Sequence, residues 1–156
     1  MASNSSSKDT VRKDPLPVFC FYVVIPKLME DDNDKAFFKS VSGLRYETEI
    51  VPVRAGGAND TTYNLVGATK WSPLVLKQGF VKGSKLLEWR QKWITGEEMT
   101  RVNGSIIQLD TALNPMAQWD FVRGWPSKWE LGEFDASKSE LAIETLEIAH
   151  DGLKLA

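Results

Sequence analysis

Clustered and alternating apolar positions predict a chain built mainly of short strands. Val18–Ile25 is an unbroken run rich in aromatic and β-branched residues, which is typical of a strand covered on both faces. In Leu44–Ile50 apolar or uncharged residues alternate with charged ones, so we expect a strand with one buried and one solvated face. The other strand candidates are residues 37–41, 71–80, 105–111 and 118–125, with a turn at Asn114–Pro115 between the last two.

One segment predicts a helix, Ser84–Thr95. Its residues Leu86, Trp89 and Trp93 fall on one stripe at helical spacing, and Ser84 can cap the first turn. Gly96 then supplies a stop signal.

The last segment, Ser139–His150, fits two interpretations. The spacing of Leu141, Thr145 and Ile148 and the content of Glu, Ala and Leu favour a helix on propensity. The alternation along 143–148 would serve a strand equally well. With one helix among six to eight short strands, the pattern predicts a mainly β protein with a small barrel or sandwich.

The length of 156 residues suits one domain with a hydrophobic core. We expect a flexible arm over residues 1–14, which are polar and serine-rich and do not resemble a secretory signal, and a single domain over 15–156. No apolar run is long enough to span a bilayer. The net charge of −2 gives no electrostatic basis for binding nucleic acid, and the single Cys20 indicates a reducing compartment such as the cytoplasm.

The residue types that carry catalysis or bind metals are scarce. His150 is the only histidine, which excludes a histidine-rich zinc site, and we expect it to be solvated or at an interface. Cys20 lies in the most apolar run, where a thiol acts as a small hydrophobe. The acidic run 31–34 fails the EF-hand pattern, because Ala36 and Ser42 stand where glycine and glutamate are required. We therefore expect no catalytic site, no metal and no cofactor.

The six tryptophans could form a sugar-binding platform. Their positions in the predicted helix and strands favour a role in the core or at a subunit interface instead.

Five segments, in order along the chain, resemble motifs of the contractile phage tail-tube family, especially its branch in extracellular contractile injection systems. They are Phe38–Leu44 with Glu47 (F-x-x-V-S-G-L…E), Val53–Asn59 (Y-R-E-G-G-x-N), Leu74–Gly79 (L-x-L-K-R-G), Trp119–Lys128 (W-x-x-x-N-A-W-P-x-K) and Leu141–Leu153 (A-I-E-x-L-E-L-x-H-E-G-L). The chain departs from these motifs at Ala55, Gln78 and Arg123–Gly124. The first two departures change charge near expected subunit contacts.

The resemblance implies a tail-tube fold like that of hemolysin-coregulated proteins, a small β-barrel or sandwich with one flanking helix. Six copies would form a ring, and rings would stack into a hollow tube. It also implies that the last segment is a strand. The loop Arg54–Asn64 would pack between rings, with Arg54, Gly56, Gly57, Asn59 and Lys77 as candidate contacts between subunits.

The function implied is that of an inner-tube subunit in a phage-tail-like contractile injection system, without catalytic turnover. Expected partners are further copies of the chain, a sheath protein, baseplate or spike and tube-terminator proteins, and cargo or a tape-measure protein in the lumen; the chain itself would not insert into a membrane. Assembly in the cytoplasm would precede incorporation into the particle. The alternatives are a specialised initiator or terminal tube paralogue, a monomeric barrel that binds a ligand through its tryptophans, and a small hydrolase centred on His150.

Overall fold

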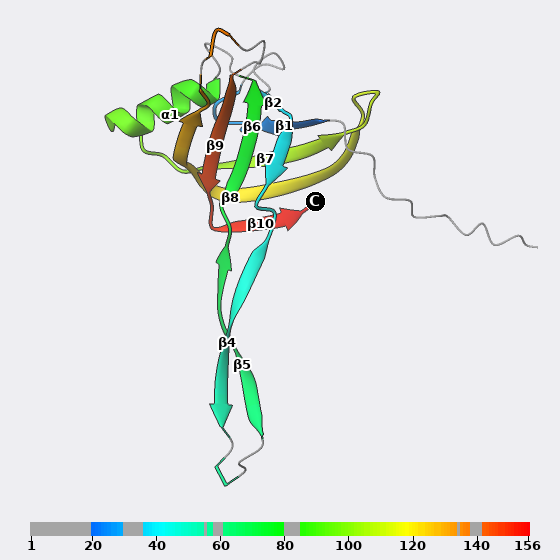
Figure 1. The fold of residues 1–156 in the computed structure, drawn as a ribbon, viewed down its shortest axis with the longest axis vertical. Coiled ribbons are helices and arrows are strands. Elements are labelled where there is room, and N and C mark those ends of the chain that lie inside the picture. Colours follow the sequence, from blue (N-terminus) through cyan, green and yellow to red (C-terminus); the bar gives the residue numbers. More distant parts are fainter. Residues whose placement is uncertain are drawn as a thin grey trace, which may run out of the picture.

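The computed structural model describes residues 20–29, 36–54, 56–57, 61–79, 85–133, 135–137 and 142–156. Within them, ten strands and one helix follow one another along the chain (Figure 1). They are β1 (Cys20–Val24), β2 (Ala36–Phe38), β3 (Ser40–Ser42), β4 (Tyr46–Arg54), β5 (Thr62–Trp71), β6 (Leu74–Gly79), α1 (Lys85–Thr95), β7 (Val102–Leu109), β8 (Pro115–Leu131), β9 (Ile143–Ala149) and β10 (Gly152–Leu155). The predicted arm 1–14 and the acidic run 31–34 lie outside the described residues.

Eight strands form one antiparallel sheet in the order β2-β1-β7-β8-β9-β6-β3, with β10 beside β8. The two ends of this path, β2 and β3, are separated only by Lys39, whose backbone N–H donates to the carbonyl of Lys77 in β6 at 2.9 Å. The sheet therefore curls around its own core, and β6 and β9 cross the direction of β7 and β10 (Figure 1). The path is that of a strongly curved sheet and not of a closed barrel.

The length of β8 allows this curvature. Its first half pairs with β7 on one side and β10 on the other, and its second half pairs with β9. The register shifts between Pro126 and Lys128, which is the β-bulge geometry that bends a strand and increases its twist. Trp125 and Pro126 thus lie next to an irregularity in the observed sheet.

The hydrophobic core lies inside the curved sheet and under α1. Its fully buried side chains come from strands far apart in sequence and include Val23, Leu74, Ile106, Phe121 and Ile148. Leu86 and Trp89 of α1 are buried against the same cluster. The prediction of a mainly β fold with one flanking helix is confirmed for the described residues.

The helix ends as the sequence predicts. Gly96 has φ +72°, a conformation that glycine adopts at low cost. Its N–H donates to the carbonyl of Trp93 at 3.3 Å, and the N–H of Glu97 donates to the carbonyl of Lys92 at 3.1 Å. This pair of bonds is a Schellman motif, which satisfies the last carbonyls of the helix. The predicted cap, Ser84, lies outside the described residues.

The last segment is a strand, so the helix that propensity favoured there is wrong. β9 buries Glu144, Leu146 and Ile148 while the residues between them are more exposed, which is the period of two of a strand. Both of its neighbours, β6 and β8, supply backbone hydrogen bonds. Pairing on both edges of β9 outweighs its helix propensity, because helix propensities of ordinary residues differ by only tenths of a kcal/mol per residue.

The long hairpin β4–β5 differs most from the prediction. The sequence predicts a half-buried strand at 44–50 and a long mobile loop at 54–64. Instead β4 continues to Arg54 and β5 begins at Thr62, so the two ends of the predicted loop belong to strands. Almost all residues of both strands are exposed, and the hairpin extends away from the main sheet (Figure 1). The alternating pattern correctly predicted a strand and wrongly predicted a buried face.

No helix in the described part of the chain has the length and apolar character needed to cross a membrane. The same residues contain no group of three or more His, Cys, Asp or Glu side chains placed to hold a metal ion.

Candidate assembly surface

One face of the hairpin carries an exposed apolar stripe. In the register of β4 and β5, Val51 lies opposite Leu65 and Val53 lies opposite Tyr63, so all four side chains share a face. Their exposed fractions are between 41% and 58%. Contiguous exposed apolar side chains of this kind mark a surface that binds another protein.

The opposite face of the hairpin is apolar near its middle and polar toward its tip. Ile50 and Val66 form a strongly exposed pair there. The next pairs on this face, Pro52 with Asn64 and Arg54 with Thr62, are mostly polar. A partner that covers both faces therefore meets apolar contacts along one side and hydrogen-bonding groups at the end of the other.

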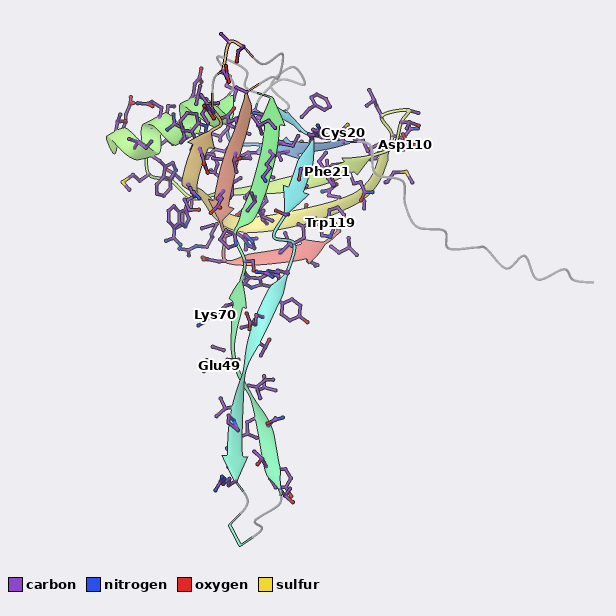
Figure 2. All side chains as sticks on the ribbon, viewed as in Figure 1. Cys20, Phe21, Glu49, Lys70, Asp110 and Trp119 are labelled. Atoms are coloured by element: carbon purple, nitrogen blue, oxygen red, sulfur yellow. The ribbon has the colours of Figure 1, made fainter. Side chains whose placement is uncertain are left out.

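An irregularity in the middle of the hairpin fixes its twist. The register shifts between Thr48 and Ile50, at Glu49, which Figure 2 labels beside the crossing point of the two strands. Gly67 faces this point, and a Cβ on it would lie 2.8 Å from the carbonyl oxygen of Glu49. Just before the irregularity, the hydroxyls of Thr48 and Thr69 are 3.0 Å apart and share a hydrogen bond. Glycine at position 67 thus permits the close strand approach that the bulge requires.

The root of the hairpin is defined here as Arg45, Tyr46, Trp71 and Ser72. The rings of Tyr46 and Trp71 lie 5.5 Å apart in a tilted arrangement. Nε of Arg45 donates to the Ser72 hydroxyl at 2.9 Å, and the Ser72 N–H donates to the Arg45 carbonyl at 3.2 Å. These contacts hold the two strands together where they leave the body.

Gly43 lets the chain enter the root. It has φ +86°, and a Cβ on it would lie 1.9 Å from the carbonyl oxygen of Pro73. Only glycine fits such a position without movement of the backbone.

The structure brings together three of the five candidate contact residues. Arg54 ends β4, and Gly56 and Gly57 form the turn that follows it at the hairpin tip. Gly57 has φ +84°, a conformation that glycine adopts at low cost. Lys77 lies in β6, where it pairs with Ser40 and Thr145, and so belongs to the main sheet and not to the tip. Asn59 lies outside the described residues.

Strand β10 offers a second surface for association. Gly152–Leu155 pairs with Trp119–Val122 of β8, and no other described strand pairs with its far edge. A sheet edge with open backbone donors and acceptors is a template for a strand from another chain. Leu155 at its end is 65% exposed.

A polar cluster lies where β7, β8 and β10 run side by side. The Ser105 hydroxyl donates to Oδ1 of Asp120 at 2.6 Å, and Nε2 of Gln118 donates to the same oxygen at 2.8 Å. The bond from Gln118, followed by that from Ser105, holds the pKa of Asp120 below its ordinary value. Lys154 pairs with Asp120 in the β10–β8 register and adds to this shift. The carboxylate is therefore kept charged near neutral pH and is a weaker proton acceptor than an ordinary aspartate.

An open groove of about 440 Å³ lies beside the hairpin root. Its lining residues are Ser42, Gly43, Arg45, Ser72, Pro73, Val75 and Glu147. The Ser72 hydroxyl in this lining accepts a hydrogen bond from Nε of Arg45 at 2.9 Å.

Three tryptophans, Trp93 of α1 and Trp125 and Trp129 of β8, pack between the helix and the sheet. Trp93 stacks on Trp125 with ring centres 5.7 Å apart, and the Arg90 guanidinium lies 4.1 Å above the Trp129 ring. Nε1 of Trp129 donates to the buried Glu144 carboxylate at 2.7 Å. These ring faces are occupied by the protein's own side chains, which disfavours a sugar-binding platform.

The sequence matches the family of the T4-like virus tail tube protein gp19 over residues 17–154. Because this match spans most of the chain, the protein belongs to that tail-tube family. No curated protein matches the sequence.

Solved structures of contractile injection systems share the fold. A chain of the sheath–tube complex of an extracellular contractile injection system (PVC, extended state) has 23% identity and a TM-score of 0.73, with 99% of each chain covered. A chain of the anti-feeding prophage baseplate has 21% identity and a TM-score of 0.75, covering 92% of this chain and 97% of its own. A chain of the cap that terminates the tube of that prophage has 19% identity and a TM-score of 0.74, with 99% of each chain covered. The expected tail-tube fold is confirmed.

Proposed function

We propose that this protein is a structural subunit of the inner tube of a phage-tail-like contractile injection system. Family membership gives the tail-tube assignment. The observation that carries the proposal for this chain is the exposed apolar hairpin, because an isolated two-stranded ribbon in water is marginally stable at best. A neighbouring copy that covers Val51, Val53, Tyr63 and Leu65 would stabilise the ribbon and the assembly together.

The assembly that we propose is a six-membered ring, with rings stacked into a hollow tube. Within a ring, the open edge of β10 would pair with a strand of the next copy. Such a head-to-tail contact uses two different surfaces, and it closes into a ring when the rotation between copies fits. Between rings, the hairpin would reach the adjacent layer, with Arg54, Gly56, Gly57 and Asn59 at the contact. Lys77, on the main sheet, would contribute a separate ionic contact.

The partners that we propose are those that a contractile tube of this kind requires. A sheath protein would surround the tube and drive it outward when it contracts. Baseplate or spike proteins and a terminator would close the two ends, and the lumen would carry cargo or a tape-measure protein. The chain would contribute no catalytic turnover, and its assembly would take place in the cytoplasm.

A specialised initiator or terminal ring is the second candidate. The likeness to chains of a baseplate and of a tube-terminating cap supports it. The two roles differ in one property, since a main tube subunit polymerises alone and a specialised ring does so only on a template.

Negative-stain electron microscopy of the purified full chain, together with a light-scattering mass, tests the proposal. We expect six-fold rings or stacked tubes. A Gly57→Val variant tests the tip, because a β-branched residue is strongly disfavoured at φ +84°. We expect it to shorten or abolish tubes, with Gly96→Val as the matched control, because Gly96 has a similar φ of +72° and open space around it but lies at the end of α1. A strict monomer at every concentration, also in the presence of preformed ring ends, would overturn the assignment as a tube subunit.

A further inference from the structure

The orientation of the hairpin depends on few contacts with the rest of the protein. β4 and β5 contact each other extensively and no other described helix or strand to a comparable degree. Besides the two covalent connections, the root is joined to the body by His150, which follows β9. The His150 ring lies 5.9 Å from the ring of Trp71, and its Nε2 lies 3.0 Å from the carbonyl oxygen of Ser72.

Both ring nitrogens of His150 face acceptors. Nδ1 lies 3.1 Å from the carbonyl oxygen of Gly152, and Nε2 lies 3.0 Å from that of Ser72. A carbonyl oxygen can only accept, and a neutral imidazole has one donor nitrogen and one acceptor nitrogen. In either neutral tautomer one of the two contacts would set a lone pair against an oxygen. Only the imidazolium, with a proton on each nitrogen, makes both contacts hydrogen bonds.

The two acceptors belong to different parts of the molecule. Gly152 opens β10, which forms the open sheet edge, and Ser72 follows β5 at the hairpin root. His150 is 9% exposed, so water competes weakly for either bond. This position was expected to be solvated or at an interface, and the structure places it inside the subunit, between its two candidate assembly surfaces.

We propose that His150 is a proton-operated clamp that fixes the hairpin root to the start of β10. With two protons on the ring, both bonds form and the hairpin holds one orientation relative to the open edge. With one proton, one bond is lost and the hairpin pivots at Trp71–Leu74. Because the ring carries either one proton or two, the clamp makes the relation between the two surfaces depend on the protonation state of His150.

Charged groups on the elements around His150 do not supply an alternative switch in the pH range where a histidine ordinarily titrates. Asp151 of the β9–β10 turn is paired with Arg123 of β8 at 2.9 Å and with Arg101, just before β7, at 3.5 Å. Arg45 on the hairpin side donates to the Ser72 hydroxyl, which fixes the residue whose carbonyl faces His150.

The other charged residues on the strands near His150 lie opposite residues of the opposite charge on the neighbouring strand. In the strand register, Glu47 of β4 lies opposite Lys70 of β5, and Glu147 of β9 lies opposite Lys128 of β8. Lys154 of β10 pairs with Asp120. Carboxylates, lysines and arginines ordinarily change charge well outside the range of histidine.

Nuclear magnetic resonance tests the clamp directly, because the chain contains one histidine and its ring signals need no assignment. The ¹⁵N-labelled full chain would be titrated between about pH 5 and 8. We expect two protonated ring nitrogens at the acid end of this range. On loss of the second proton, we expect the amide protection factors at the hairpin root, which are corrected for the intrinsic pH dependence of exchange, to fall about tenfold or more, which corresponds to one charge-assisted hydrogen bond. A ring that keeps one unprotonated nitrogen wherever the protein is folded would overturn the proposal.

Two variants separate the clamp from other effects. In His150→Gln the side chain cannot titrate and its amide donates to one carbonyl at a time, so we expect low protection factors at the root that no longer change with pH. Asp151→Asn removes the nearest carboxylate in sequence, and we expect the response to pH to remain. If Asp151→Asn abolishes the response, the clamp is not His150. These measurements use the subunit alone, so their outcome does not depend on whether the protein forms tubes. The consequence of the clamp for the two assembly surfaces does rest on the proposed function.

Discussion

Replacing two side chains of the apolar stripe by threonine should raise the concentration at which the protein assembles. Val53 and Tyr63 lie opposite each other and are 42% and 58% exposed in the subunit. Full burial of a large apolar side chain is worth about 1.5–3 kcal/mol, so covering the exposed half of each contributes about 1 kcal/mol. The double variant Val53→Thr/Tyr63→Thr therefore loses about 2 kcal/mol per contact, or roughly 30-fold in the association constant.

Threonine is chosen because it keeps the high strand propensity of the residues that it replaces. The fold of the subunit should thus be retained, with a thermal midpoint within a few degrees of the unmodified chain, since neither side chain is in the core. Sedimentation over a series of concentrations measures the critical concentration for assembly, and circular dichroism checks the fold.

The control is Ile94→Thr, which replaces an apolar side chain on α1 that is 66% exposed, more than Val53 or Tyr63, and lies away from the hairpin. We expect the control to assemble at the concentration of the unmodified chain. An unchanged critical concentration in the double variant would refute the argument that the stripe is covered by a neighbouring copy. If the control and the double variant lose assembly equally, general loss of apolar surface is responsible and the stripe has no special role.

Three further changes test the packing and charge of the subunit. Gly43→Ala should destabilise the fold by at least about 3 kcal/mol in chemical denaturation, because positive φ and the clash with Pro73 add together. Gly104→Ala should cost about 1–3 kcal/mol in the same assay, since its Cβ would lie 2.5 Å from the Phe121 ring. Asp120→Asn should remove a pH-dependent part of the stability: the lowered pKa of Asp120 stabilises the fold above the ordinary value of 3.8, and this stabilisation disappears as pH falls through the folded-state pKa.

Each of these has a clear contrary result. Gly56→Ala is the control for both glycine variants, since a Cβ there would meet nothing within 4 Å, and equal stability losses in all three would contradict the steric argument. For Asp120, the difference in unfolding free energy between the two proteins should shrink as the pH is lowered below the ordinary value of this carboxyl. A difference that stays constant down to strongly acid pH would show that the carboxylate is not stabilised by folding.

The core strands and the helix follow from local rules, and this explains which predictions hold. α1 has its apolar stripe and a glycine that ends it, both readable from neighbouring residues. The strand at β9 could not be separated from a helix by the same rules, because its edges are satisfied by β6 and β8, which are remote in sequence. Its buried Glu144 also breaks the apolar pattern, and its partners Gln78 and Trp129 are known only from the fold.

The hairpin could not be derived for a different physical reason. The alternation along Leu44–Ile50 shows that one face of the strand carries no charged residues. A strand whose face is covered by another copy of the protein has the same pattern as a strand whose face packs on the core of its own subunit. Beyond Ile50, Val51 and Val53 place apolar residues in the other phase of the alternation, up to the region interpreted as a loop, which contains Tyr63. The two adjacent glycines favoured that interpretation, although they occupy only the turn. Similarly, no local signal shows that both nitrogens of His150 face carbonyl oxygens.

The departure of this chain from the family motif at positions 123 and 124 has a structural basis. Arg123 has φ +54°, a conformation that asparagine, the motif residue, adopts more readily than arginine. The arginine offsets the strain through its ion pair with Asp151 at 2.9 Å, and the Asn103 side chain accepts its backbone N–H at 3.0 Å. Gly124 replaces the motif alanine, whose Cβ would lie 2.6 Å from the Phe121 ring. The two substitutions therefore act together: glycine makes room for a fully buried aromatic ring, and arginine anchors the turn that leads into β10 and the hairpin root.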